Sequence, residues 1–211
     1  MDRYTDLQES LIAGDEAGVK ELVAKLLGQG AVPGAIISDG LIAGMAEVGK
    51  RFKAGDMFIP EVMLCARVMS AGMTMLEPLL VGMQMPNAGK VVIGTVEGDV
   101  HNIGKDLVSM MIRSAGFHVV DLGVQVPCEK FAEAVAQHSP DVLGMSALLT
   151  TTMPMMREVI ELLEKRDLRD RVKIIVGGAP VTQEFADKIG ANGYATDAAS
   201  AVDKVKELLG I

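Results

Sequence analysis

The sequence predicts an α/β protein made of two parts, a helical bundle followed by a parallel β-sheet with helices on both faces. Apolar residues recur at every third or fourth position through residues 1–85, whereas short apolar runs alternate with amphipathic stretches from Lys90 onward. A segment rich in turn-forming residues, Gly82–Gly89, separates the two patterns. We therefore expect two domains, at residues 1–86 and 87–211.

The first part is predicted to be a bundle of four or five helices. Helical spacing of apolar residues appears in Leu7–Leu11, in Val19–Leu27 and in Ala35–Phe52. A further stretch, Pro60–Leu80, begins with a proline, which is favoured in the first turn of a helix.

The second part alternates between predicted strands and helices. The strands are expected at Lys90–Val96, His118–Leu122, Asp141–Ser146, Val172–Val176 and Gly193–Ala195. The helices are expected at Ile103–Ala115, Glu129–Gln137, Met155–Lys165, Thr182–Ile189 and Ala199–Leu209. This alternation is typical of a parallel sheet with right-handed crossovers. Because ligands bind such sheets beyond the carboxyl ends of the strands, the loops at that edge are the expected functional region.

The composition argues against several classes of function. A formal net charge of −8 without a basic block gives no surface for nucleic acid, and an aromatic content of 3% without Trp offers no stacking platform for bases. Apolar runs such as Val91–Val96 are too short to span a bilayer, and the acidic N-terminus lacks a signal-peptide core. We expect a cytoplasmic protein that binds neither nucleic acid nor membrane. Cys65 and Cys128 match no metal or redox pattern and are expected to be free thiols.

The strongest chemical signal lies directly after the first predicted strand, in the segment Gly98-Asp99-Val100-His101-Asn102-Ile103-Gly104. The imidazole of His101 is a good ligand for a transition metal. Asp99 could accept a hydrogen bond from the other ring nitrogen, which fixes the tautomer and raises the basicity of the ligand. Gly104 would let the backbone approach a bulky ligand closely. A histidine that merely caps the next helix or packs in the loop is the alternative that this motif alone leaves open.

Two further loops are expected at the same edge of the sheet. The loop after the third strand carries four hydroxyl side chains, Ser146, Thr150, Thr151 and Thr152. Taken alone, these could be helix caps ahead of Pro154. The loop after the fourth strand contains Gly177 and Gly178, which alone would indicate a tight turn. Together, the three loops offer a metal ligand, hydrogen-bond donors and a surface without side chains.

This combination of motifs resembles the cobalamin-binding domain family. The family signatures Asp-x-His-x-x-Gly, Ser-x-Leu and Gly-Gly occur here in order, as Asp99/His101/Gly104, Ser146/Leu148 and Gly177/Gly178. Residues 40–78 are similar to the helical cap that precedes this domain in B12-dependent methionine synthase. The same two-domain unit makes up small corrinoid proteins of methyltransferase systems, so the resemblance covers essentially the whole chain. It implies a helical cap followed by a Rossmann-like (flavodoxin-like) B12-binding domain.

The resemblance also implies a set of residues around the cofactor, a cobalamin or related cobamide. The cofactor would bind base-off, with its nucleotide tail displaced from cobalt and His101 as the lower axial ligand. Asp99 would hydrogen-bond His101, and Thr152 would complete this relay where methionine synthase has a serine. The remaining implied contacts are Gly98, Val100, Asn102 and Gly104 around the ligand, Ser146, Leu148, Thr150, Gly177, Gly178 and Ala198 along the tail, and Phe58 and Val62 on the methyl face.

The implied function is that of a corrinoid methyl carrier in one-carbon metabolism, cycling between Co(I) and methyl-Co(III). The implied partners are a substrate-specific methyltransferase, a methyltransferase that passes the group to tetrahydrofolate or coenzyme M, and a reductive activator. The chain would then be a carrier component rather than a stand-alone enzyme. The methyl donor (methylamine, methanol, betaine or a methoxylated aromatic), the acceptor, the lower base and the oligomeric state stay open.

Three alternatives are kept. The B12-binding subunit of an adenosylcobalamin-dependent mutase carries the same histidine loop, but it is usually joined to a barrel and lacks this cap. A B12-binding regulatory module would usually add a DNA-binding helical domain, and no basic helix is present in the sequence. A flavodoxin-like domain without cobalt would leave the co-occurrence of three loop signatures unexplained.

Overall fold

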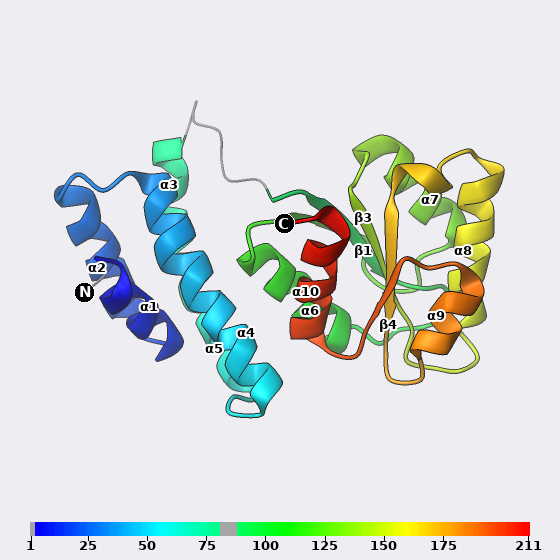
Figure 1. Ribbon diagram of the computed structural model, residues 1–211, viewed down its shortest axis with the longest axis horizontal. Helices are drawn as coiled ribbons and strands as arrows, with labels where there is room; N and C mark the ends of the chain where they lie inside the picture. Colours follow the sequence, from blue (N-terminus) through cyan, green and yellow to red (C-terminus); the bar gives the residue numbers. More distant parts are fainter. Residues whose placement is uncertain (1–2, 81–87) are drawn as a thin grey trace. The chain divides into compact units, whose positions relative to one another are not determined.

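The computed structural model of the chain describes residues 3–80 and 88–211, which form an N-terminal helical unit and a C-terminal sheet unit (Figure 1). The sheet unit begins at Ala88. The predicted boundary between residues 86 and 87, and most of the predicted linker, lie outside the described residues.

The helical unit is built from amphipathic helices that bury one face each. Its elements are α1 (Thr5–Ile12), α2 (Glu16–Gly28), α3 (Pro33–Ala35), η1 (Ile36–Ile42), α4 (Ala43–Ala54), α5 (Ile59–Leu76) and η2 (Glu77–Leu80). The side chain of Asp15 caps α2 by accepting a hydrogen bond from the backbone N–H of Gly18. Leu7 and Leu11 of α1 and Val19 of α2 are fully buried, so the predicted spacing does mark the core.

The stretch predicted as one helix over 35–52 contains a π-helical segment, η1. Gly40 lies in this segment, and a Cβ atom there would come within 2.5 Å of the Leu7 side chain. The absence of a side chain therefore allows α1 to pack closely against η1. Apolar periodicity does not distinguish a π turn from an α turn, which is why the sequence did not reveal it.

Helix α5 is long and apolar enough, by length and composition alone, to cross a membrane, with a mean hydropathy of 1.3 over 18 residues. The sequence expectation considered only shorter apolar runs. One face of α5, including Val62, Cys65 and Val68, is buried within the protein. The core helix of a globular unit passes the same length and composition test, and α5 packs against α2 and α4 in this way. Cys65 and Cys128 are free, as expected, and both are buried.

The sheet unit confirms the predicted parallel α/β architecture. Its strands are β1 (Lys90–Thr95), β2 (His118–Asp121), β3 (Val142–Ser146), β4 (Lys173–Gly177) and β5 (Gly193–Ala195), all parallel, in the order β2-β1-β3-β4-β5. Its helices are α6 (Ile103–Ser114), α7 (Cys128–His138), α8 (Pro154–Lys165), η3 (Arg169–Arg171), α9 (Gln183–Ile189) and α10 (Ala198–Leu209). Every predicted strand and helix of this unit is present, with its bounds shifted by at most one residue.

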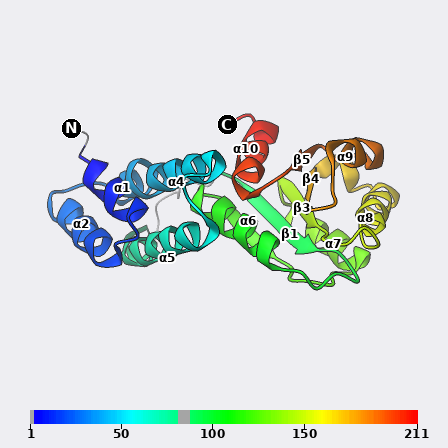
Figure 2. The same ribbon diagram turned by 90° about the horizontal axis from the view of Figure 1, so that it is seen from below.

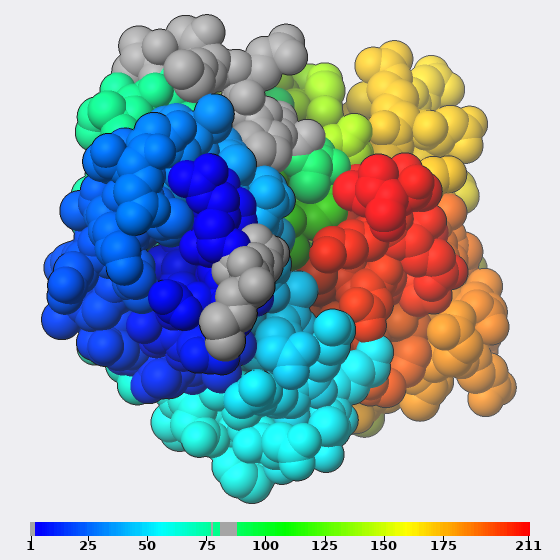
Figure 3. All heavy atoms as spheres, turned by 60° about the vertical axis from the view of Figure 1, so that its left-hand side comes forward, coloured from blue at the N-terminus to red at the C-terminus, as the bar shows by residue number. Residues whose placement is uncertain are grey.

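The helices cover both faces of the sheet. Figure 2 shows α6 and α10 on one side and α7, α8 and α9 on the other, and Figure 3 shows α10, in red, at the surface of this unit. Val92, Leu143 and Ile174 lie side by side in register on β1, β3 and β4, and they pack into one core with Phe131 and Met156. Strands that are buried on both faces read as continuous apolar runs, which explains the sequence pattern.

The strand order reverses at β1. The chain crosses from β1 to β2 on one side and later returns to place β3 on the other side, where Thr95 pairs with Ser146. The connections after β1 and β3 therefore leave in opposite directions, and the opening between them is the usual ligand site of such folds.

Candidate functional site

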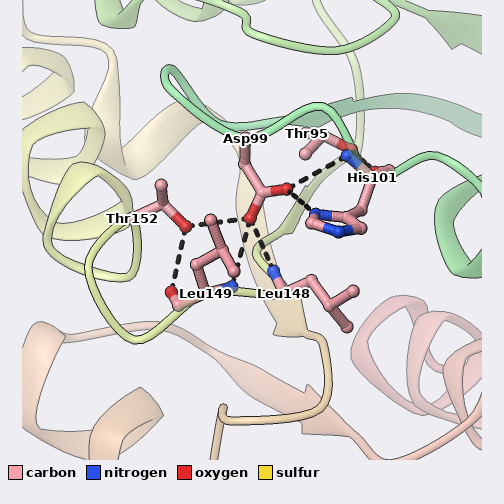
Figure 4. A network of polar contacts seen from close by, with 6 residues as sticks. All are labelled: Thr95, Asp99, His101, Leu148, Leu149 and Thr152. Carbon is pink, nitrogen blue, oxygen red and sulfur yellow. Dashed lines mark hydrogen bonds and ion pairs between the residues drawn. The ribbon is translucent and has the colours of Figure 1, made fainter.

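The loop after β1 carries a buried carboxylate that holds a histidine. Asp99 is fully buried, and its Oδ1 atom lies 2.7 Å from Nδ1 of His101 and accepts a hydrogen bond from the His101 backbone N–H at 3.1 Å (Figure 4). One carboxylate oxygen thus fixes both the backbone and the ring of His101.

The other oxygen of Asp99 joins this loop to the loop after β3. Oδ2 accepts hydrogen bonds from the backbone N–H groups of Leu148 at 2.7 Å and Leu149 at 3.2 Å, and from Oγ1 of Thr152 at 2.9 Å (Figure 4). The sequence resemblance pointed to Asp99, His101 and Thr152 as a group, and the structure brings their side chains within hydrogen-bond distance. The two leucine amides were not foreseen, because backbone donors leave no mark in a sequence.

These contacts determine the protonation of Asp99. Burial alone would raise the pKa of this carboxyl, but the hydrogen bonds from Leu148, His101 and Thr152 outweigh it and hold the pKa well below its usual range. Because an ionised carboxylate can only accept, Nδ1 of His101 must be the donor, which leaves Nε2 for another partner. The His101 side chain is 45% exposed, so an external ligand can reach it.

A buried hydroxyl is hydrogen-bonded to the backbone of the histidine. Thr95, the last residue of β1, is fully buried, and its Oγ1 donates a hydrogen bond to the carbonyl oxygen of His101 at 3.0 Å. We did not select Thr95 from the sequence, because threonine is a common strand residue. The available signal was a hydroxyl at the end of an otherwise apolar run, just before the histidine loop.

The other predicted residues of the histidine loop are open to solvent. Val100 and Asn102 are exposed, and Asn102 donates from Nδ2 to Oδ2 of Asp106 at 2.8 Å. A Cβ atom at Gly104 would meet no atom within 4 Å, so the backbone of α6 is accessible there. Gly98 has a left-handed φ of 78°, which a glycine adopts without strain.

The predicted tail-contact residues lie at the carboxyl edge of the sheet. Ser146 is half-buried at the end of β3, Thr150 is exposed, and Ala198 is buried at the start of α10. Gly178 has a φ of 126°, and a Cβ atom there would lie 1.9 Å from the carbonyl oxygen of Ala147. The close approach of two loops therefore already requires glycine at Gly178, whatever else packs there.

Exposed apolar side chains flank His101 in both loops. Val100, Ile103, Leu148 and Leu149 are all exposed, and Ile103 is 73% exposed. Exposed apolar groups gathered around a polar centre are typical of a ligand-binding surface. Ile103 and Leu149 were not among the sequence candidates. Any amphipathic helix start or loop can carry such residues, so only their exposure in the fold singles them out.

The two predicted cap residues differ in accessibility. Phe58, just before α5, is 69% exposed, whereas Val62 is fully buried. The side chain of Phe58 is therefore accessible from outside the helical unit, and that of Val62 is not. The assignment of both to the methyl face stays a prediction.

The residues present suit a metal that brings most of its own ligands. Within residues 3–80 and 88–211, no group of three or more His, Cys, Asp or Glu side chains could hold a metal ion. His101 supplies one ring nitrogen, and the carboxylate of Asp99 is bonded to the other. The backbone at Gly104 is accessible, and exposed apolar side chains lie near the histidine in the sequence and in the loop after β3. A metal held in a large, mostly apolar macrocycle fits this donor set.

Comparison with known proteins agrees with this site. Two family models, both described as B12 binding domain, match residues 89–203 and residues 4–77. A dimethylamine corrinoid protein of Methanosarcina barkeri is 48% identical over 97% of this chain and 96% of its own length.

Two solved structures are similar over nearly the whole chain. A crystal structure of the methanol:cobalamin methyltransferase complex of Methanosarcina barkeri matches with a TM-score of 0.89 and 31% identity, over 99% of this chain and 80% of that one. A cobalamin-binding protein of Desulfitobacterium hafniense matches with a TM-score of 0.78 and 32% identity, over 96% of both chains. The chain therefore belongs to the B12-binding domain family, among the corrinoid proteins of methyltransferase systems, and its cofactor is a corrinoid.

Proposed function

We propose that this protein carries a methyl group between two methyltransferases, with His101 as the lower axial ligand of a corrinoid bound base-off. The observation that carries the proposal is an exposed imidazole whose Nδ1 is held by a buried carboxylate, so that Nε2 is available at the switch point of the sheet. The bound corrinoid supplies a cobalt atom that can accept a methyl group from one partner and release it to another.

The residues around His101 adjust its strength as a ligand. Asp99, held ionised by its donors, makes the imidazole more basic through Nδ1. Thr95 and Asp99 hold the backbone of His101 in place. The chain would thus provide an axial ligand whose ring and backbone are both held by hydrogen bonds.

The relatives support a choice of methyl donor and partners. The dimethylamine corrinoid protein is 48% identical to this chain, whereas the chain from the methanol complex is 31% identical. We therefore propose a methylated amine as the donor, delivered by a substrate-specific methyltransferase. A second methyltransferase, using tetrahydrofolate or coenzyme M, and a reductive activator complete the proposed system, which we place in the cytoplasm.

A spectroscopic experiment tests the axial ligand. Apo protein is loaded with cobalamin, reduced to the Co(II) state and examined by electron paramagnetic resonance, in which a nitrogen ligand splits the cobalt lines. We expect nitrogen splitting in the unmodified protein and its loss in His101→Ala, with the benzimidazole base displaced in both. Benzimidazole nitrogen still bound to cobalt in the unmodified protein would contradict the proposal.

The mutase alternative is tested by the alkyl group. Protein purified from its native source should carry a cobamide that accepts methyl from a methylated amine in the presence of its methyltransferase. Retention of an adenosyl group, together with inactivity toward methyl donors, would favour the adenosylcobalamin-dependent mutase instead.

A further inference from the structure

The start of α6 carries a buried lysine, Lys105, which forms ion pairs with two partly exposed carboxylates. The Nζ atom of Lys105 lies 2.6 Å from Oδ2 of Asp121, at the end of β2, and 2.5 Å from Oδ1 of Asp106. Only 2% of the Lys105 side chain is exposed. Lysine is rarely buried without a partner, so its position here depends on these carboxylates.

The segment that carries Asp121 is itself bonded to the histidine loop. Oδ1 of Asp121 accepts a hydrogen bond from the N–H of Gly123, and the carbonyl of Gly123 accepts one from the N–H of Thr95. The N–H of Gln125 donates to the carbonyl of Asp99 at 3.0 Å. Lys105 therefore connects α6 to the same segment that already braces β1 and Asp99.

The ion pair also reaches the residue next to the histidine. Asp106, one partner of Lys105, accepts a hydrogen bond from Nδ2 of Asn102. The chain from His101 to Lys105 is thus bonded at both ends: through Asp99 to the loop after β3, and through Lys105 to the end of β2.

Stability alone does not explain a buried lysine at this position. Removing the Lys105 ammonium from water costs free energy that its attraction to the partly exposed carboxylates of Asp121 and Asp106 only partly offsets, and an apolar side chain of similar size often serves stability as well or better. What a short ion pair provides and an apolar contact does not is a defined direction and distance. That property matters most where a nearby group must be held in one orientation.

We propose that Lys105, acting through its ion pair with Asp121, is a positioning residue for His101. It fixes the first turn of α6, and with it the exit of the histidine loop, while Asp99 fixes the entry. The consequence for cobalt ligation rests on the proposed function, whereas the consequence for the loop itself does not. The experiment below separates the two.

The first measurement uses apo protein. Hydrogen exchange of the His101 amide, which is bonded to Asp99, is compared in the unmodified protein, Lys105→Met, Asp121→Asn and the control Lys204→Met. The control removes an ion pair of similar length, Lys204–Glu207 on α10, away from the loop. We expect about tenfold faster exchange in the first two variants, with β3 and β4 unchanged, and no change in the control. Unchanged exchange in both site variants would overturn the proposal.

The second measurement uses cobalamin-loaded protein. In the Co(II) state, the ratio of nitrogen-ligated to unligated cobalt should fall about tenfold in Lys105→Met, the lower end of the effect expected for a supporting residue behind a metal ligand. Lys105→Arg, which keeps the positive charge, should retain part of the nitrogen-ligated fraction that Lys105→Met loses.

If the unmodified protein shows no nitrogen ligation, the proposed function fails while the exchange result still decides the role of Lys105 in the loop. If Lys105→Met does not fold, Asp121→Asn decides, and failure of both to fold overturns a specific positioning role.

Discussion

The hydroxyl of Thr152 lies 2.9 Å from Oδ2 of Asp99, and this contact joins the loop after β3 to the loop after β1. The same hydroxyl lies 2.9 Å from the carbonyl oxygen of Leu149. A hydroxyl has one hydrogen, so it donates to Asp99 or to Leu149 at any moment but not to both. The number of hydrogen bonds that Oδ2 of Asp99 accepts, and through it the strength of the bond between Oδ1 and His101, therefore depends on which way this hydrogen points.

Replacing Asp99 with Asn should weaken the ligand without preventing cobamide binding. The amide removes the negative charge behind His101, so the imidazole becomes a poorer donor to the higher oxidation state of cobalt. We expect a Co(II)/Co(I) potential that is less negative, and methyl transfer about 10–100-fold slower. Spectroelectrochemistry and stopped-flow transfer with the donor methyltransferase measure these two quantities. An unchanged potential and an unchanged rate would show that Asp99 does not act on cobalt through His101.

Replacing Thr152 with Val should shift the potential in the opposite direction. Valine has nearly the same shape but cannot donate to Oδ2, so the carboxylate keeps more charge for its bond with Nδ1 of His101. His101 then becomes a stronger electron donor to cobalt, and the Co(II)/Co(I) potential should become more negative. Thr152→Ser, which keeps the hydroxyl, is the matched control and should stay close to the unmodified protein. Shifts of the same sign in Asp99→Asn and Thr152→Val would contradict this account of the network.

The sequence predicted the sheet unit well because its signals are local. Each strand is a short apolar run and each helix an amphipathic stretch, so the alternation reveals the order of elements, and their carboxyl ends indicate where a ligand binds. The π-helical segment Ile36–Ile42 was not predicted, because the apolar spacing of a π turn does not distinguish it from an α turn.

The site was predictable only in part, for a related reason. His101, Asp99 and Thr152 could be selected by their chemistry and by family resemblance. The amides of Leu148 and Leu149 and the hydroxyl of Thr95 could not, because their roles depend on the packing of separate segments. Similarly, Val62 was selected by resemblance to the family's helical cap, and only the fold reveals that its side chain is fully buried.

Replacing Gly104 with Ala should separate stability from cofactor binding. Outside its chain neighbours and the nearby backbone of α6, no atom lies within 4 Å of the position that a Cβ would take, and Gly104 is in the first turn of this helix, where alanine is favoured over glycine by at most about 0.5–1 kcal/mol, the value for a helix interior. We expect the apo protein to become slightly more stable in urea unfolding and its affinity for cobalamin to fall, because the methyl group enters the space left for the corrin. An affinity equal to that of the unmodified protein would mean that the cofactor does not approach α6 here.

The hydrogen bonds to Asp99 should make the stability of the apo protein depend on pH in a defined range. They lower the pKa of Asp99 in the folded protein, so the folded state binds the proton less readily than the unfolded chain, in which the pKa is about 3.9. The stabilisation is therefore complete well above this value and is lost as the pH falls below about 4. Urea unfolding of the unmodified protein and Asp99→Asn should give a constant difference between about pH 7 and pH 5, which then shrinks on further acidification. Asp170→Asn, at an exposed carboxylate, serves as the control. A difference that does not change with acidification would mean that the charge on Asp99 is not what these donors stabilise.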